Sequence, residues 1–299
     1  MTLVECVPNF SDGRDASIAA AIQQGIRSVP GVRLLDWHSD PDHHRSVATF
    51  SGQGEPVAEA AFRAVVAAAE RIDLSAHRGV HPRMGATDVC PFVPLERDGL
   101  GACVELAHGL GRRVAGELAI PVYFYGAAAL RPERRALPEV RRGGFETLRE
   151  AVARDPRRTP DLGPRVLHPT AGAIAIGARG FLVAFNVNLE TGDLAIARDI
   201  ARAIRESSGG LPGIRALGFA LASAGIVQVS VNVCEPTRTG LRQVFDEVQR
   251  LARERGVAVR DSELVGLAPR ACLDADIARA VCLRGFDPRR HVLEDALEA

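Results

Sequence analysis

Apolar residues along this chain recur with two different periods, and segments of the two kinds follow one another in order. The runs 3–10 and 87–93 are short and apolar, which predicts strands. The segment 17–29 instead places Ile18, Ile22 and Ile26 four residues apart, as one face of a helix requires. The further predicted strands are 32–36, 46–51, 120–125, 181–189, 214–222, 226–234 and 263–267, and the further predicted helices are 57–72, 101–118, 144–153, 194–207, 239–255 and 274–283. Strands that alternate with helices predict an α/β (α+β) fold.

The order of these elements repeats in the two halves of the chain. A strand ending in Asn9-Phe-Ser-Asp-Gly13 precedes a helix, and Asn188-Leu-Glu-Thr-Gly192 occupies the same place in the second half. One such match could arise by chance, but each half then continues as strand, strand, helix, strand. The pattern predicts two ferredoxin-like β-α-β-β-α-β subdomains, 1–178 and 179–299, with a ligand groove between them.

Charge and composition exclude several classes of protein. The 299 residues are 46% hydrophobic and 25% charged, typical of a globular chain. The 37 basic and 37 acidic residues balance, so neither nucleic acid nor a membrane is an expected partner. All the basic residues are Arg, which excludes a lysine Schiff base and a P-loop lysine whether or not codon bias is the cause.

The N-terminus and the cysteines indicate the compartment. The first ten residues have no basic start and no long apolar core, so they do not predict a signal peptide. The six cysteines form no Cys-x-x-Cys pair and lie mostly in apolar runs, which favours reduced core thiols. We therefore expect a cytoplasmic protein.

Two predicted strands of the second half carry an unusual polar side. Valine and phenylalanine occupy one face of 181–189 and of 226–234, as period two requires. The other face presents uncharged hydrogen-bonding groups: Asn186, Asn188, Gln228, Ser230 and Asn232. Such a row suits a planar ligand that has both donors and acceptors. The alternative is an ordinary solvated sheet face.

A histidine on a glycine-rich loop is the leading candidate for proton transfer. His81 precedes Pro82, which favours extended backbone, and Gly79 and Gly85 flank it. The pKa of a histidine lies near neutrality, so His81 suits acid–base work. From these features alone, the plainer interpretation is a loop histidine that bonds to a carbonyl. The sequence has no Gly-x-Ser-x-Gly elbow and no nucleophilic Cys beside it, so covalent acyl chemistry is not indicated.

A second group of histidines raises the question of a metal. Residues 36–44 contain six potential ligands: Asp36, His38, Asp40, Asp42, His43 and His44. Their spacing matches neither the His-x-x-x-His of a helix nor the His-x-His of a strand. We expect a turn rich in Asp, Pro and His and no metal, and a metal hydrolase stays a minor alternative.

Taken together, these segments resemble the formiminotransferase family. The matching stretches run in order along nearly the whole chain: 4–11, 45–50, His81-Pro-Arg-Met-Gly-Ala-Thr-Asp-Val-Cys-Pro-Phe92, 121–126, 160–164, 177–179, 182–189 and 228–232. The chain departs from the family pattern at His38, His44 and Ala171, the last standing where an aromatic residue would stack on folate.

The resemblance implies a site and its substrates. It implies two α/β subdomains with folate in the groove between them, a homodimer, and His81 as the catalytic histidine. Tetrahydrofolate would be the co-substrate and N-formiminoglutamate the donor, without a metal. The residues implied to contact folate are Gly163, Pro164, Arg165, Val166, Leu167, His168, Pro169, Thr170, Ala171, Gly172 and Gly209.

The expected reaction moves the formimino group of N-formimino-L-glutamate to N5 of tetrahydrofolate, with His81 shuttling the proton. The glutamate carboxylates call for forked Arg donors, for which Arg45 and Arg83 are candidates. The residue that orients His81 is open among three carboxylates: Asp36, Asp40 and Asp88. Two alternatives remain: a formyltransferase that uses N-formylglutamate, and a folate-binding protein without catalysis.

Overall fold

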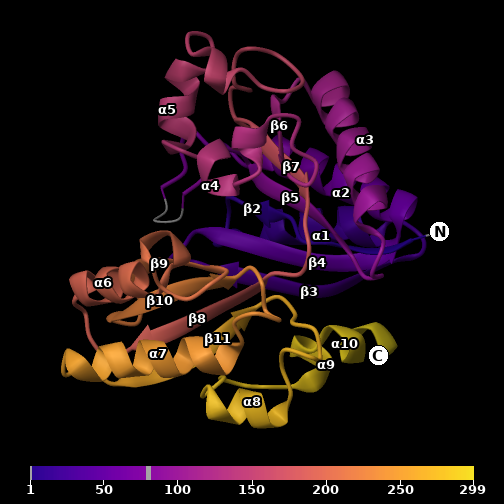
Figure 1. Ribbon diagram of the computed structural model, residues 1–299. Helices are drawn as coiled ribbons and strands as arrows, with labels where there is room; N and C mark the ends of the chain where they lie inside the picture. Colours follow the sequence, from indigo (N-terminus) through magenta and orange to yellow (C-terminus); the bar gives the residue numbers. More distant parts are fainter. Residues whose placement is uncertain (1, 79–81) are drawn as a thin grey trace. The chain divides into compact units, whose positions relative to one another are not determined.

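The computed structural model describes residues 2–78 and 82–299, and its contacts divide the chain into two compact units (Figure 1). These are the N-terminal unit, Met1–Gly180, and the C-terminal unit, Phe181–Ala299. The described helices include none that is both long and apolar enough to cross a membrane.

The first part of the N-terminal unit has the predicted ferredoxin-like topology. Its elements are β1 (Leu3–Cys6), β2 (Asn9–Phe10), α1 (Ala16–Arg27), β3 (Val32–Asp40), β4 (Arg45–Gln53), α2 (Gly54–Arg71) and β5 (Thr87–Pro94). The sheet runs β3, β4, then β1 with β2, then β5, and all these pairs are antiparallel. The predicted strand 3–10 is divided at Val7 and Pro8, because proline has no N–H for the ladder.

Two parallel strands extend this sheet. Helix α3 (Leu100–Leu118) leads to β6 (Val122–Gly126), and β7 (Ile174–Ala178) lies parallel between β5 and β6. The sequence did not predict β7: its five residues alternate isoleucine with alanine and glycine, so they carry little strand signal. Between β6 and β7 lie the short helices η1 (Pro132–Arg134), α4 (Leu137–Val140), α5 (Gly144–Ala151) and η2 (Pro156–Arg158).

Helices cover the N-terminal sheet on both faces. On one face, α1, α2 and α3 pack over a core that includes Phe10, Phe50 and Phe92. On the other face, α4 and α5 cover the β5–β7–β6 part, around Tyr123 and Leu148 (Figure 1). The parallel extension is therefore buried on both sides, as parallel sheets usually are.

The C-terminal unit also has the predicted ferredoxin-like order. Its elements are β8 (Val183–Leu189), α6 (Leu194–Ile204), η3 (Glu206–Ser208), β9 (Ile214–Leu221), β10 (Ile226–Val233), α7 (Leu241–Glu254), β11 (Val259–Val265), α8 (Ala275–Ala280), α9 (Pro288–His291) and α10 (Leu293–Glu298). The antiparallel sheet runs β11-β8-β10-β9. Its apolar face forms a separate core with α6 and α7, around Phe185, Val229 and Phe245.

Candidate active site

The loop 163–172, predicted to contact folate, lies against both flanks of the segment that contains His81. Before that segment, the N–H of Leu74 donates to the Thr170 carbonyl at 2.9 Å. After it, the N–H of Ala86 donates to the Ala171 carbonyl at 2.9 Å. His81 itself lies outside the described residues. The backbone thus brings the predicted folate loop beside the chain that enters and leaves the predicted catalytic histidine.

Two glycines make this close approach possible. A Cβ atom on Gly85 would stand 1.9 Å from the carbonyl oxygen of Ala173. A Cβ atom on Gly172 would stand 2.4 Å from the carbonyl oxygen of Met84, and Gly172 also has a φ of +68°. Only glycine fits where two backbones meet at such distances. Both residues lie in motifs that the resemblance singled out.

The loop 163–172 has a buried floor and an exposed rim. Leu167, Ala171 and Gly172 are buried, and Gly163, Arg165, Val166 and Pro169 are exposed, with Pro164, His168 and Thr170 between the two. His168 and Gly172 exchange backbone hydrogen bonds of 3.0 Å, and Nδ1 of His168 accepts the N–H of Ala171 at 3.0 Å. The side chain of Ala171 packs into the core under α1, α2 and α3. Ala171 therefore offers no ring on which a ligand could stack, and its predicted contact with folate stays a prediction.

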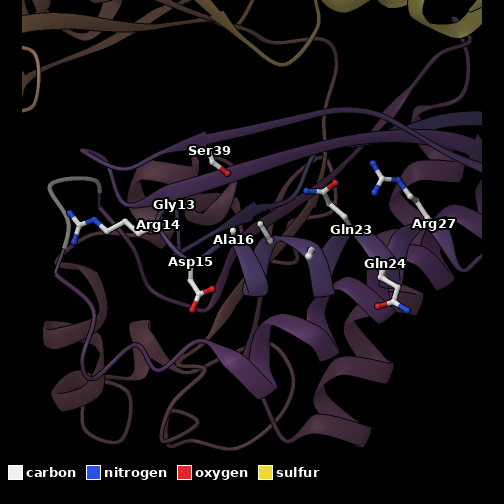
Figure 2. A pocket seen from close by; sticks show the side chains of 10 residues that line it. Gly13, Arg14, Asp15, Ala16, Gln23, Gln24, Arg27 and Ser39 are labelled. Carbon is white, nitrogen blue, oxygen red and sulfur yellow. The ribbon is translucent and has the colours of Figure 1, made fainter.

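A groove of about 520 Å³ runs along helix α1, and the sequence analysis did not anticipate it (Figure 2). It is lined by Gly13, Arg14, Asp15, Ala16, Ala19, Ala20, Gln23, Gln24, Arg27 and Ser39. Arg14 and Arg27 stand toward its two ends, and small alanine side chains leave the helix surface open between them. The sequence signal that could have indicated this groove is the side of the helix made of alanines and glutamines.

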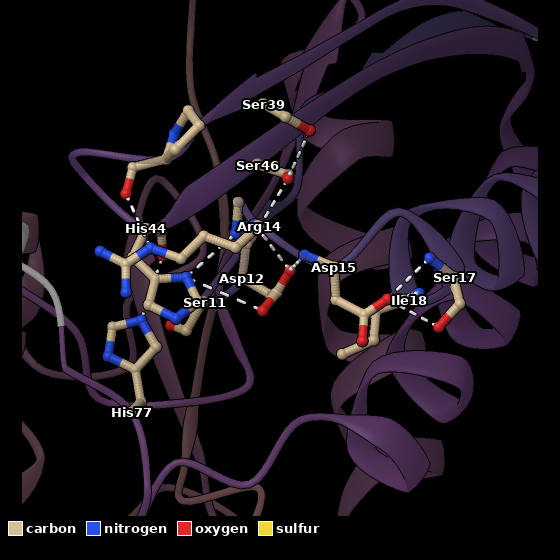
Figure 3. Close-up of polar contacts among 12 residues, drawn as sticks. Ser11, Asp12, Arg14, Asp15, Ser17, Ile18, Ser39, His44, Ser46 and His77 are labelled. Atoms are coloured by element: carbon tan, nitrogen blue, oxygen red, sulfur yellow. Dashed lines mark hydrogen bonds and ion pairs between the residues drawn. The ribbon is translucent and has the colours of Figure 1, made fainter. Parts of the chain in front are cut away.

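Two histidines stack where the β3–β4 turn meets the chain before His81 (Figure 3). The rings of His44 and His77 have centroids 4.3 Å apart and an interplanar angle of 25°. Nε2 of His77 lies 3.1 Å from the carbonyl oxygen of His44, so it carries the proton and donates. Nδ1 of His77 is then a buried acceptor, and it has no hydrogen-bond partner among the described residues. Sequence reasoning missed His77, because nothing in its spacing connects it to His44.

Both histidines are held toward the neutral form. Burial lowers the pKa of His77, and the hydrogen bond to the His44 carbonyl opposes that shift. Burial and the neighbouring His77 and Arg14 lower the pKa of His44, against the attraction of Asp12. Nδ1 of His44 accepts the N–H of Gly13 at 3.2 Å, which also fits an unprotonated ring nitrogen. Neutral imidazoles can exchange protons with a reacting group at neutral pH.

Asp88, one of the carboxylates proposed to orient His81, is tied to the backbone and to arginines. Oδ1 of Asp88 accepts the N–H of Met84 at 2.8 Å, and Oδ2 lies 2.9 Å from Nη2 of Arg141. Burial raises the pKa of Asp88, while Arg141 and Arg45 lower it. Burial lowers the pKa of Arg45 to about 10, and Arg141 adds to that shift. Asp88 thus fixes the backbone at Met84, and its carboxylate lies among positively charged arginines.

The other predicted candidates around His81 have defined places. Arg83 donates from Nη2 to the carbonyl oxygen of His77 at 3.1 Å, and the same atom lies 2.8 Å from Oε1 of Glu146. Asp36 lies in β3 opposite Thr49 of β4. None of these positions tests the roles predicted for Arg45, Arg83 and the three carboxylates, which stay predictions.

The Asp/His-rich turn is closed by its own residues. Oδ2 of Asp40 lies 2.7 Å from Nδ1 of His43. Burial pushes the pKa of Asp40 upward, but the hydrogen bonds from His43 prevail and lower it to about 2. Within the described ranges, no three His, Cys, Asp or Glu side chains are grouped as a metal ion would require.

The sequence analysis expected an uncharged polar face on the C-terminal sheet, but this face also carries carboxylates. Strand β11 begins at Val259, earlier than predicted, and its register sets Asp261 beside Asn188 and Glu263 beside Asn186. The amides bond to these carboxylates: Asn188 to Asp261 at 2.6 Å, and Asn186 to Glu263 at 3.0 Å. The row is therefore a mixed amide and carboxylate face.

Gly209, also predicted to contact folate, belongs to the C-terminal unit. It follows η3 with a φ of +84° and is exposed. The folate roles of Gly209 and of the loop 163–172 stay predictions, as does the groove expected between the two subdomains.

Comparison with known proteins identifies the family. The family model described as the formiminotransferase domain, N-terminal subdomain, matches residues 3–179, and the formiminotransferase domain model matches residues 184–278. A protein of Streptococcus pyogenes serotype M1 named glutamate formimidoyltransferase is 44% identical over 296 residues, covering 99% of this chain and 98% of that protein. One of the same name from Thermoplasma acidophilum is 46% identical over 301 residues, covering 100% and 98%.

A longer animal protein matches over about half its length. The formimidoyltransferase-cyclodeaminase of Sus scrofa is 44% identical over 279 residues, which cover 91% of this chain and 51% of that protein. The two family models together span both units of the fold. This chain therefore belongs to the formiminotransferase family.

Proposed function

We propose that this protein is a glutamate formimidoyltransferase, which moves the formimino group of N-formimino-L-glutamate to N5 of tetrahydrofolate. The observation that carries the proposal is the similarity, from end to end, to two proteins of that name. The contact between the loop 163–172 and the flanks of the His81 segment adds support, because a two-substrate transfer needs both partners in one place.

The reaction requires one proton to move between two nitrogens. The lone pair of the neutral N5 amine attacks the formimino carbon, and a tetrahedral intermediate forms. The bond from that carbon to the glutamate nitrogen then breaks, while N5 loses a proton and the departing nitrogen gains one. His81 accepts the first proton and delivers the second, a contribution typically worth about 10²–10⁴-fold. Holding the two substrates in register supplies the rest.

The residues around the His81 segment suit an anionic donor. N-formiminoglutamate brings two carboxylates, and the described neighbours of this segment include Arg14, Arg45 and Arg83. His44 and His77 are held toward the neutral form, so they add no positive charge, which would lower the pKa of a nearby catalytic base. A base with a pKa near neutrality is the form that acid–base transfer needs.

A transfer assay tests this proposal. Purified protein is mixed with tetrahydrofolate and either N-formiminoglutamate or N-formylglutamate, and the folate product is followed by absorbance. We expect turnover with the formimino donor, and a loss of about 10²–10⁴-fold in His81→Ala with tetrahydrofolate binding retained. His291→Ala, in α9 of the C-terminal unit, is the matched control and should keep full activity.

Other outcomes of this assay would redirect the proposal. Faster turnover with N-formylglutamate would make the protein a formyltransferase. Tetrahydrofolate binding without turnover from either donor would leave a folate-binding protein without catalysis. Equal activity in His81→Ala would remove the histidine from the mechanism.

We also propose that the enzyme works as a homodimer in the cytoplasm, on small-molecule substrates and without a metal, nucleic acid or a membrane. The family resemblance supports the dimer, and six free thiols support a reducing compartment. Sedimentation at micromolar concentration checks the dimer, and a monomer there would contradict it.

A further inference from the structure

The polar face of the C-terminal sheet carries a connected hydrogen-bond network centred on Gln228. The side-chain NH2 of Gln228 donates to Oδ1 of Asn188 at 3.0 Å and to Oε1 of Glu263 at 2.9 Å. Glu263 also receives the amide of Asn186 and, on its other oxygen, Nη2 of Arg284 at 3.0 Å. Three strands therefore contribute to one network: β8, β10 and β11. Its members hold one another in fixed orientations.

The network fixes the orientation of the Gln228 amide. Both N–H groups of this side chain are used, and both of their partners are acceptors. Turning the amide over would set its oxygen against the Glu263 carboxylate, which is unfavourable. The carbonyl oxygen Oε1 must therefore point away from these partners. It is buried and has no hydrogen-bond partner in the described part of the chain.

The face thus has more acceptors than donors. The second acceptor is Oδ2 of Asp261, whose ion-pair contacts among the described residues are with arginines at 3.9 and 4.0 Å, beyond hydrogen-bond length. Leaving a buried acceptor unpaired is costly, so such a site favours a ligand that brings N–H donors. On the adjacent strand β9, Phe219 stands opposite Gln228 and Leu217 opposite Ser230, which gives an apolar side to the same face.

The charge of the face selects among the parts of the two substrates. Asp261 and Glu263 repel the carboxylates of formiminoglutamate and of the folate tail. The pterin ring is uncharged and planar, and its 2-amino and N3–H groups form one donor edge. Resting on the proposed function, we propose that Gln228 and Asp261 bind the donor edge of the pterin ring of tetrahydrofolate.

Binding of substrate fragments to the full-length protein tests this assignment. Calorimetry compares tetrahydrofolate, 6-hydroxymethylpterin and p-aminobenzoylglutamate, without any donor present. Gln228→Met keeps the shape of the side chain and removes its oxygen. We expect it to weaken binding of tetrahydrofolate and of the pterin about tenfold and to leave p-aminobenzoylglutamate unchanged. Gln243→Met, at an exposed position of α7 away from this face, is the matched control.

A second variant protects the test against misfolding. Asp261→Asn changes a partly exposed side chain, and it should weaken the same two ligands even if Gln228→Met fails to fold. Unchanged pterin affinity in both variants, or a loss confined to p-aminobenzoylglutamate, would overturn the assignment. Because no donor is present, failure here is distinct from failure of the transferase proposal: a protein that transfers formimino groups with unchanged folate affinity in these variants loses only the pterin site.

Discussion

Glu5 is a buried carboxyl in the middle of a sheet. It lies in β1, opposite Ser51 of β4 and Val93 of β5, and is 5% exposed. Burial raises the pKa of Glu5 to about 7, although the nearby Arg179 lowers it. The carboxyl therefore changes charge near physiological pH.

The pKa of Glu5 predicts a dependence of stability on pH. The folded pKa is above the ordinary value of 4.5, so the folded state holds the proton more tightly than the unfolded state. The stabilising contribution is complete below about pH 4.5 and is lost as the pH rises through about 7. Glu5→Gln should remove this loss, gaining on the order of 3 kcal/mol relative to the natural chain between pH 4.5 and 8.

Urea unfolding at several pH values measures this difference. Glu70→Gln, an exposed carboxylate in α2, is the control and should show no such change with pH. A constant difference between Glu5→Gln and the natural chain across the range would contradict a raised pKa.

Single residues were predicted unevenly. The sequence could nominate His81 because a histidine between glycines and before a proline is a local pattern. The sequence could not predict the partners of His77 and Gln228, because these partners come from strands and turns that are distant in the sequence. Asp261 was missed for a related reason: its place on the amide face follows from the register of β11.

At the scale of elements, strong periodicity was a good guide and weak periodicity was not. The helix predicted at 17–29 is found at Ala16–Arg27, where its isoleucines face the core. Strand β7 was missed, because its partners β5 and β6 stabilise it and its own residues are mostly small. The break between β1 and β2 could have been predicted from Pro8.

The contact of Gly85 with Gly172 predicts a sharp effect of one methyl group. Gly85→Ala would bring Cβ to 1.9 Å from the Ala173 carbonyl oxygen, so the two backbones must separate. We expect a loss of about 2 kcal/mol or more in unfolding free energy and a large loss of transfer activity. Gly116→Ala in α3 is the control, since nothing lies within 4 Å of its added Cβ.

The control should move in the opposite direction. Alanine replaces glycine inside a helix with a gain of about 0.5–1 kcal/mol, so Gly116→Ala should be slightly more stable and fully active. Thermal unfolding and the transfer assay together check both variants. Full stability and activity in Gly85→Ala would show that the backbones at Gly85 and Ala173 leave room for a methyl group.

At the scale of the whole molecule, the repeated order of elements was confirmed. Each unit contains β-α-β-β-α-β with the ferredoxin-like strand order, and the N-terminal unit adds β6 and β7. Repetition was visible because strand and helix periods differ strongly. Oligomeric state and the folate contacts depend on partners and ligands, so they remain predictions.

The separate core of the C-terminal unit predicts that it folds alone. Its apolar cluster, built on β8, β10, α6 and α7, shares no residue with the clusters of the N-terminal unit. A fragment of residues 181–299 should therefore unfold cooperatively on heating, as single domains of this size do. A fragment without a cooperative transition, or without near-ultraviolet circular dichroism, would show that it needs the rest of the chain.

The close contact between Gly85 and Gly172 also has a consequence for the order in which parts of the chain fold. It joins the entrance of β5 to the entrance of β7, with α3, β6, α4 and α5 lying between them in sequence. Such a long-range contact forms only after the intervening chain has closed its loop, so it belongs to the late steps of folding. The same dependence holds in reverse: local opening that frees the loop 163–172 also frees the chain beside His81. A ligand held by that loop should then slow hydrogen exchange at Leu74 and Ala86, whose N–H groups bond to carbonyls of the loop.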